Sequence, residues 1–599
     1  MPLFNNPLLD FLLNPWFILS LLFWLIVLLL VFLLRKKKDA TYLFFPLIVM
    51  FKTKRLNKFI KKISKKAPKF WKIFWTIGIF ISFAFTIYAF YFLFTNLINL
   101  IVAPRPENAI FPLIPGVTIG FPTLFYIILP LLFIVTTHEF AHGIAANTDG
   151  IDVKSTGVLG AGLFFIIGFG AFVEIDEREL NSNKFTRNSR LRIAAAGTFV
   201  NGITAGIAFI LVLTLPLIIA PWYRQVSQVN TVFTEAKGGF NEGNLANGDV
   251  ILAIKKQGTL DEDYISLDNY EGRTLSYILS NGTSLKSSVG DNLTLRIYNP
   301  SSDIFREKNV TLGPRYYTGI LYEYINETDL KITKIFGESD GGNNFNSNLT
   351  VGLIINTINS IPINQTKGDT LKKALTLFDL KNLTLSIDTQ NYTLNVNVTG
   401  VVIGIYSNSY FMYKNSVAKF FTSFWPEFWI REILWLFIIA FSITLFNMLP
   451  IPIFDGDRLV KELINWGIGE DYKSIKKKKE KFYFKNDEKD YELSEYRVDK
   501  IISIEIVLVD SSRIMLAEDK YELVDKIGDG FKDTVSLNLP EQKKLPEGSR
   551  IEISYDYYYD EKRKMKRGIL NSLRLIIFII ILGNFLLSFI KFGGLLFWI

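Results

Sequence analysis

LLFIVTTHEFAHGIAA, residues Leu131–Ala146, is the segment from which the architecture of this chain can be worked out. In a helix, residues four apart lie on one face, so the imidazoles of His138 and His142 can both reach one metal ion. Glu139 lies beside them, where it can take a proton from a water molecule at that metal. These are the only 2 histidines in 599 residues, which argues against a chance match. The segment therefore predicts a metal site.

The residues around this segment predict that the metal site lies in a membrane. Pro122–Ala146 is apolar and long enough to cross a bilayer as a helix. Ionisable side chains at that depth are costly unless they are paired or bind a metal. The membrane setting therefore strengthens the metal prediction.

The distribution of apolar residues predicts a multi-pass membrane protein. The chain is 49% hydrophobic and 15% aromatic, and its apolar residues gather in long blocks between polar segments. It contains no cysteine, so disulfides and cysteine-based zinc sites are excluded. The first block lacks the charged start and cleavage pattern of a signal peptide, so we expect a retained helix. The predicted spans are 15–34, 73–102, 122–146, 193–221, 428–449 and 569–587.

The positive charges predict which segments face the cytoplasm. The net charge is +9, but the Lys and Arg residues gather beside the apolar blocks, which membrane topology explains better than nucleic-acid binding. The basic clusters at 35–38, 52–72, 187–192 and 562–567 are expected to be cytoplasmic. The N-terminus and residues 222–427 are then outside, and the metal site lies nearer the cytoplasmic face.

Two apolar stretches do not fit a membrane-spanning helix. Tyr42–Phe51 is too short to cross a bilayer and contains Pro46, so we expect it at the membrane interface. Ser155–Val173 is apolar but rich in glycine, which predicts extended or re-entrant structure associated with the membrane.

Two polar regions predict folded domains outside the bilayer. Trp222–Phe420 contains two similar strand-and-helix patterns, beginning at Gly248 and Gly352, which suggests two related small domains. It also holds nine Asn-x-Ser/Thr sequons, which either mark glycosylation outside the cell or follow from the Asn- and Thr-rich composition. Asp471–Arg567 alternates apolar and polar residues, which predicts a small cytoplasmic domain rich in β-strands.

Two histidines leave a catalytic zinc one protein ligand short, because such sites usually have three. With no cysteine and no further histidine, the third ligand must be Asp or Glu. Asp149 follows His142 by only 7 residues, which leaves little chain to wrap round the ion. Asp455 stands at a helix end broken by two prolines, where an acid could also serve only the turn. The other candidates form an acidic cluster that could equally be a solvated edge: Glu174, Asp176, Glu177 and Glu179.

At two motifs the sequence resembles the site-2 protease family of intramembrane metalloproteases. One motif is HExxH in a membrane helix. The other is Asn447-x-x-Pro450-x-Pro452-x-x-Asp455-Gly456, with Phe454 where the family more often has Leu. The resemblance implies one zinc ion held by His138, His142 and Asp455, with Glu139 as general base.

Three further segments are similar to the same family, within residues 73–466. Gly170–Asp176 looks like the β segment that follows the catalytic helix, and the polar region looks like two PDZ domains. Ala196–Asn201 is similar to the family's Ala-Gly-Pro-x-x-Asn motif, with Thr198 in place of proline. Asn201 is a polar residue in an apolar helix. It is a candidate catalytic donor to an oxyanion or the substrate backbone, or else a link between helices.

The sequence therefore predicts a polytopic α-helical membrane protein with about six transmembrane helices, two extracytoplasmic PDZ-like α+β domains and a β-rich cytoplasmic domain. The expected function is zinc-dependent hydrolysis of peptide bonds within or near transmembrane segments of membrane proteins in the cell membrane, as in regulated intramembrane proteolysis, with the external domains as a size filter. The alternatives are a metal-holding receptor or scaffold, and an HExxH peptidase with a glutamate ligand near 174–179. The expected divisions are 1–72, 73–221, 222–346, 347–420, 421–466, 467–567 and 568–599.

Overall fold

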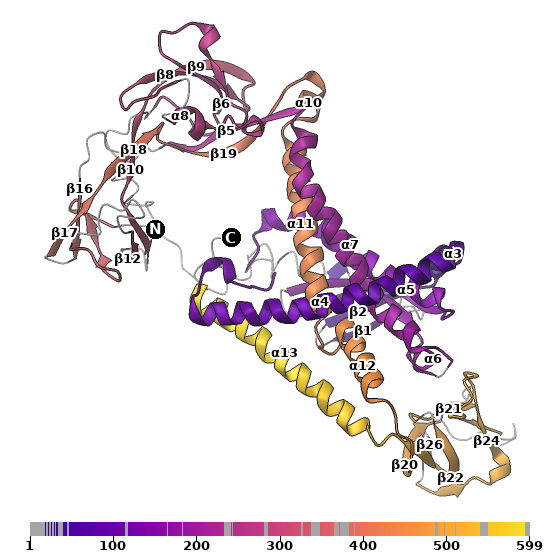
Figure 1. The fold of residues 1–599 in the computed structure, drawn as a ribbon. Coiled ribbons are helices and arrows are strands. Elements are labelled where there is room, and N and C mark those ends of the chain that lie inside the picture. The colour runs from indigo at the N-terminus through magenta and orange to yellow at the C-terminus, as the bar shows by residue number, and fades with distance from the viewer. Residues whose placement is uncertain are drawn as a thin grey trace. The chain divides into compact units, whose positions relative to one another are not determined.

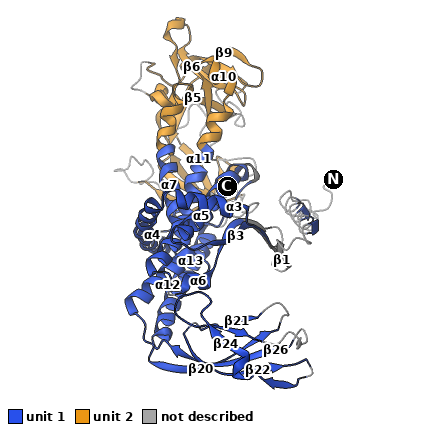
Figure 2. Ribbon diagram, turned by 90° about the vertical axis from the view of Figure 1, so that its right-hand side faces the viewer, with its two compact units in different colours: residues 1–211, 431–599 blue, residues 212–430 orange. Residues whose placement is uncertain are grey.

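The computed structural model divides into two compact units, residues 1–211 with 431–599 and residues 212–430 (Figure 2). It describes scattered positions between 18 and 33 and the following ranges: 40–44, 47–113, 118–163, 166–182, 184–232, 241, 243–280, 285–324, 328–336, 348–363, 371, 382–387, 390–484, 489–495, 497–509, 511–538 and 549–592.

Five helices among the described residues are long and apolar enough to cross a membrane. They match five of the predicted spans in order, and Figure 1 shows them as long rods. The predicted first span, 15–34, lies outside the described residues except at a few positions. The five helices are α4 (Pro68–Val102), α5 (Phe121–Thr148), α7 (Arg187–Ile219), α11 (Phe424–Asn447) and α13 (Arg563–Phe592).

Polar side chains link two of these helices inside the apolar packing. Asn584 of α13 is fully buried and accepts a hydrogen bond from Asn96 Nδ2 of α4 at 2.8 Å. The Asn584 amide also donates to the backbone oxygen of Leu93 at 2.9 Å. Each such bond between membrane helices contributes about 1 kcal/mol, because lipid offers no competing partner. The two helices are thereby fixed in register beside the helices that carry the metal-site motifs.

The glycine-rich stretch after α5 forms two strands of a four-stranded antiparallel sheet with the order β1-β2-β3-β4. These strands are β1 (Ala40–Phe44), β2 (Leu47–Thr53), β3 (Val153–Leu163) and β4 (Ile166–Ile175). The expected extended structure at 155–173 is therefore present. Of the residues expected only to lie at the interface, 42–44 belong to strand β1 and 47–51 to its partner β2, and β2 is followed by α3 (Arg55–Lys66).

One glycine shows why this sheet requires small residues. A Cβ placed on Gly157 would lie 2.1 Å from the carbonyl oxygen of Phe51 on the neighbouring strand β2. Any other residue would push the two strands apart. The sheet ends at β4, whose outer edge pairs with no other described strand and adjoins α5.

The second unit contains two apolar cores. The first lies in a sheet with the order β19-β5-β6-β8-β9, to which β7 (Ile265–Ser266) adds at β6. The helix α8 (Leu275–Leu279) packs on this core. The strands are β5 (Tyr223–Val232), β6 (Val250–Lys256), β8 (Asn292–Asn299), β9 (Ile304–Thr311) and β19 (Ile405–Tyr413).

The second core runs from Ile320 to Leu394. Strand β19 pairs with β5 along its whole length, so the first core takes residues from both ends of the polar region 222–420. The two cores are therefore not separated by a single cut at 346/347, where the sequence places the boundary. The remaining strands are β10 (Gly313–Tyr317), β11 (Ile320–Tyr324), β12 (Leu330–Ile335), β13 (Ile354–Ile355), β14 (Thr357–Ile358), β15 (Ile361–Pro362), β16 (Asn382–Ile387), β17 (Gln390–Asn395) and β18 (Asn397–Val402).

The region before α13 is rich in strands, as the alternating pattern predicts. Its two antiparallel sheets have the orders β20-β26-β22-β23 and β21-β25-β24, and they enclose an apolar core. The strands are β20 (Ser474–Tyr483), β21 (Asp490–Glu492), β22 (Val498–Val507), β23 (Arg513–Met515), β24 (Tyr521–Val524), β25 (Thr534–Leu537) and β26 (Arg550–Tyr559). The remaining helices are α6 (Glu177–Asn181), α10 (Ser416–Phe421) and α12 (Asp455–Ile468).

Candidate metal centre

Three buried side chains point their donor atoms at one position. His138 and His142 lie one turn apart on α5, and their Nε2 atoms are 3.2 Å from each other. Oδ2 of Asp455, the first residue of α12, lies 3.2 Å from the first Nε2 and 3.3 Å from the second. Each of the three residues is less than 10% exposed (7%, 8% and 8%). Donors about 2.0–2.1 Å from a tetrahedral zinc lie roughly 3.3 Å apart, so both the donor types and their spacing fit zinc.

The chain reaches Asp455 through a break in helical structure, as the two prolines predict. Between α11 and α12, Ile453 adopts a positive φ of 88° and is 97% exposed. Gly456 follows the acid, and a Cβ there would lie 2.2 Å from the carbonyl carbon of Met448. Only glycine permits this close approach of the chain to itself, which brings Asp455 to the histidines.

The hydrogen bond on the far side of His142 fixes which nitrogen is free to bind a metal. Nδ1 lies 2.7 Å from the backbone oxygen of Ile193 on α7. A carbonyl oxygen only accepts, so Nδ1 carries the proton and Nε2 of the neutral ring keeps its lone pair. This is the usual arrangement of a histidine that ligates a metal through Nε2.

Asn201 contacts Nδ1 of His138, just as the Ile193 carbonyl contacts Nδ1 of His142. The amide nitrogen Nδ2 is 3.0 Å from His138 Nδ1, while the amide oxygen is buried with no hydrogen-bond partner. With the amide turned end for end, that oxygen would accept a hydrogen bond from the Nδ1–H of His138, which would leave Nε2 free for metal. The sequence suggested a donor to an oxyanion or a link between helices, and the geometry favours a residue that orients His138.

Two further residues on α7 complete this wall of the site. The hydroxyl of Thr198, fully buried, donates to Asp455 Oδ2 at 3.2 Å. Gly197 faces both imidazoles: a Cβ there would lie 2.4 Å from His142 Nε2 and 2.6 Å from His138 Nε2. In the sequence, Thr198 stands out only as a departure from a motif, and Gly197 is not a candidate site residue. Both residues lie in the Ala196–Asn201 stretch that resembles a family motif, and that motif was the signal that could have found them.

Glu139 lies at the edge of the sheet rather than among the metal ligands. Its Oε2 accepts a hydrogen bond from the backbone nitrogen of Val173 on β4 at 3.0 Å. The carboxylate lines a cavity of about 810 Å3 that also contains His138, His142 and Asp455. A carboxylate beside the three donors, within the same cavity, is positioned for proton transfer.

The other acids considered as third ligand are engaged elsewhere. Asp149 forms two hydrogen bonds with the guanidinium of Arg192, at 2.7 and 2.8 Å. Glu174 accepts from Ser155 and, at 3.0 Å, from Lys52, and these bonds lower the pKa of its carboxyl. Among the described residues, the three-residue cluster is the one group able to hold a metal. The remaining acids have these contacts: Asp176 caps α6, Glu177 pairs with Arg458 and Glu179 pairs with Lys184.

A comparison with known protein families matches residues 126–483 to the model described as peptidase family M50. That match covers more than half of the chain and spans both motifs. The chain belongs to peptidase family M50. M50 enzymes are zinc metalloproteases, and membership agrees with the resemblance to site-2 proteases.

Two curated relatives of this M50 chain share shorter segments with it. One is described as a membrane-bound transcription factor site-2 protease homolog of Arabidopsis thaliana, 24% identical over 34% of this chain. The other is an uncharacterized protein of Methanocaldococcus jannaschii, 32% identical over 25% of this chain. The alignments span 38% and 39% of those relatives, so they bear on part of the chain's length. Family membership and the five apolar helices together establish a multi-pass integral membrane protein.

Proposed function

We propose that this protein is an intramembrane zinc metalloprotease that cuts peptide bonds within or near transmembrane segments of membrane proteins. The observation that carries this proposal is the convergence of Asp455 with His138 and His142 beside Glu139, the last three residues lying on a helix apolar enough to span a membrane. A receptor or scaffold that only held a metal would not need a carboxylate in the same cavity.

The side chains divide the chemistry between them. When bound, zinc supplies a Lewis acid that polarises the substrate carbonyl and makes water more acidic. Glu139 takes a proton from the attacking water and gives it to the departing amine. The backbone hydrogen bond from Val173 holds the Glu139 carboxylate toward the cavity. Asn201 and Ile193 orient the two imidazoles, and Thr198 orients Asp455.

The sheet edge at β4 presents the substrate to these groups. A peptide in a helix hides its carbonyls, so it must be extended before it is cut. The N–H of Val173, whose register partner on β3 is Thr156, donates to Glu139 at the edge of the sheet that lines the cavity. A substrate segment that adds to β4 as a further strand would lie along the cavity wall.

We place the polar region outside the cell membrane and residues 467–567 in the cytoplasm. The basic clusters beside the membrane helices support this placement. We assign the two cores of the second unit to two PDZ-like domains, inserted in the chain between α7 and α11; the presence of two separate apolar cores supports this assignment. None of the proposed ligands lies in them, so their role is to select substrates by size, as in regulated intramembrane proteolysis.

Substitution of the proposed base tests this function. Glu139→Gln keeps the shape of the side chain but cannot take a proton, so we expect cleavage of a membrane-protein substrate in liposomes to fall at least about 1000-fold. Zinc content, measured by elemental mass spectrometry, stays at one per chain.

The matched control is Glu179→Gln, which removes a carboxylate paired with Lys184 and should leave cleavage intact. Loss of zinc together with activity in Glu139→Gln would mean that Glu139 supports the metal rather than acting as base. A variant that still cleaves would exclude Glu139 from the chemistry.

A further inference from the structure

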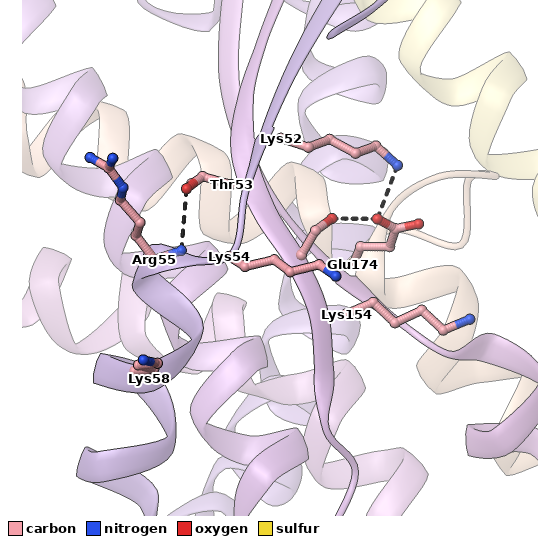
Figure 3. A pocket seen from close by; sticks show the side chains of 8 residues that line it. Lys52, Thr53, Lys54, Arg55, Lys58, Lys154 and Glu174 are labelled. Carbon is pink, nitrogen blue, oxygen red and sulfur yellow. Dashed lines mark hydrogen bonds and ion pairs between the residues drawn. The ribbon is translucent and has the colours of Figure 1, made fainter. Parts of the chain in front are cut away.

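A cationic hollow lies where strand β2 gives way to helix α3 (Figure 3). Its volume is about 1000 Å3. The catalytic scheme above uses none of its side chains. We call it the basic hollow, and its residues are Lys52, Thr53, Lys54, Arg55, Lys58, Lys154, Ser155 and Glu174.

The basic hollow carries an excess of positive charge, since five of its residues are Lys or Arg and one is Glu. Glu174 is already neutralised, because Lys52 Nζ lies 3.0 Å from its Oε2 and Ser155 donates to the same oxygen (Figure 3). Lys154 pairs with Asp176 at 2.8 Å.

The other three cations, Lys54, Arg55 and Lys58, form no ion pair with any described residue, and all three are exposed. They stand at the beginning of α3, whose first turn contains no acidic residue. Cations at this end of a helix oppose its dipole, so the protein gives up some stability to hold them there. An anion held between them would remove that penalty.

The neighbouring residues indicate where the anion comes from. On α3, Leu56 is 40% and Phe59 is 51% exposed, beside a series of lysines. Exposed apolar side chains alternating with lysines are typical of a helix that lies in the membrane interface. The helix ends at Lys66 and the membrane-spanning α4 begins at Pro68, so α3 has little chain with which to leave the bilayer surface. Lipid phosphates are the anions concentrated at that depth.

We propose that the basic hollow binds the phosphate of an anionic phospholipid headgroup, with Lys54, Arg55 and Lys58 as its direct contacts. Leu56 and Phe59 then lie among the acyl chains of the same leaflet. Glu174 also lines the catalytic cavity, so an occupied hollow adjoins the β4 edge that receives the substrate. The binding does not depend on proteolysis, and its test uses no cleavage assay.

The test measures lipid retention by the full-length protein in a nonionic detergent, where no charged bilayer surface exists. Native mass spectrometry counts phosphatidylglycerol bound per chain as the lipid is titrated, with zwitterionic phosphatidylcholine for comparison. We expect preferential binding of phosphatidylglycerol to the wild type. The triple variant Lys54→Gln/Arg55→Gln/Lys58→Gln should bind it at least about tenfold more weakly.

The matched control removes three exposed lysines from the other end of the same helix, Lys62→Gln/Lys65→Gln/Lys66→Gln. It makes the same change in net charge and should leave binding within about twofold of the wild type. Zinc content and melting temperature show that both variants remain folded. The single variant Lys54→Gln, with an expected loss of about threefold, provides a milder test.

Three results would overturn the proposal. Equal losses in the two triple variants would mean diffuse attraction to the helix rather than a site. Unchanged binding in all variants would place the lipid elsewhere. Displacement of phosphatidylglycerol by an equal concentration of inorganic phosphate would show that the hollow binds a soluble anion instead of a lipid.

Discussion

Each proposed metal ligand has a second contact; for the two histidines it lies on the ring nitrogen away from the metal, and for Asp455 it is made to Oδ2, the oxygen that faces the metal position. His142 Nδ1 donates to the backbone oxygen of Ile193, and Asp455 accepts from Thr198. His138 Nδ1 lies 3.0 Å from the Asn201 amide. All three of these contacts come from α7, so one helix orients ligands from α5 and α12. Removal of such outer contacts typically changes metal affinity or activity by about 10- to 100-fold.

Asp455 and Asp457 stand two residues apart on α12 but have different roles. Asp455→Asn removes a charged zinc ligand, so we expect zinc affinity to fall by at least about 100-fold and cleavage to be lost with it. Asp457 forms a two-pronged ion pair with Arg574 of α13, at 2.7 and 2.6 Å. Asp457→Asn should therefore retain zinc while its melting temperature falls by a few degrees.

Zinc content by elemental mass spectrometry and melting by fluorescence separate these two outcomes. Unchanged zinc content in Asp455→Asn would reject this residue as the third ligand. Lost zinc in Asp457→Asn would mean that the whole turn, rather than one carboxylate, determines binding.

At the scale of elements, the close approach of α7 to α5 determines the metal site. Gly197 is the point of contact, because a Cβ there would lie 2.4 Å from His142 Nε2. Gly197→Ala should therefore push the imidazoles out of place and reduce zinc content to less than about a tenth of the wild-type value.

Gly206 on the same helix is the matched control, since a Cβ there meets nothing within 4 Å. Gly206→Ala should keep zinc and activity, with stability unchanged or raised by about 0.5–1 kcal/mol. Full zinc content in Gly197→Ala would show that the two helices can separate without disturbing the ligands.

The elements also show how far sequence could reach. Five spans and the two histidines follow from hydropathy and spacing, which are local properties. The spacing of residues leaves Asp455 as one of several candidates for the third metal ligand, because 313 residues separate it from His142 and distance along a chain gives no distance in space. Only the resemblance of its motif to the site-2 protease family distinguishes it from the other acids. Strand β2 was missed for the same reason: its partner Gly157 lies about 100 residues away, and register is set by long-range packing.

At the scale of the whole molecule, the second unit is inserted between two membrane helices by a pair of adjacent strands. Tyr223, just after α7, is the register partner of Tyr413, shortly before α10 and α11. The chain therefore leaves and returns at nearly the same place, since opposed residues in an antiparallel pair are about 5 Å apart. The local pattern beginning at Gly248 predicts β6, but not that β19 completes its sheet from the far end of the insertion.

This adjacency makes a clean deletion possible. Residues 224–412 can be replaced by a flexible linker of about eight residues, because such a linker easily spans the short gap between paired strands. All proposed ligands lie outside the deleted segment, so we expect one zinc per chain and a folded membrane unit. If the deleted domains act as the proposed size filter, the deletion variant should cut substrates that retain a large domain outside the membrane, which the full-length protein spares.

If the second unit instead recruits substrates, the deletion should lower cleavage rather than extend it to larger substrates. An exposed sheet edge in the second unit could capture a substrate tail by strand addition, and the deletion would then lower cleavage of every substrate. Comparing one substrate with and without its external domain, in the full-length and deleted proteins, separates the two ideas. If the second unit is a filter, the deletion should raise cleavage of the larger substrate alone. If it recruits substrates, the deletion should lower cleavage of both. Loss of activity towards both substrates in a folded, zinc-bound variant would therefore reject the filter.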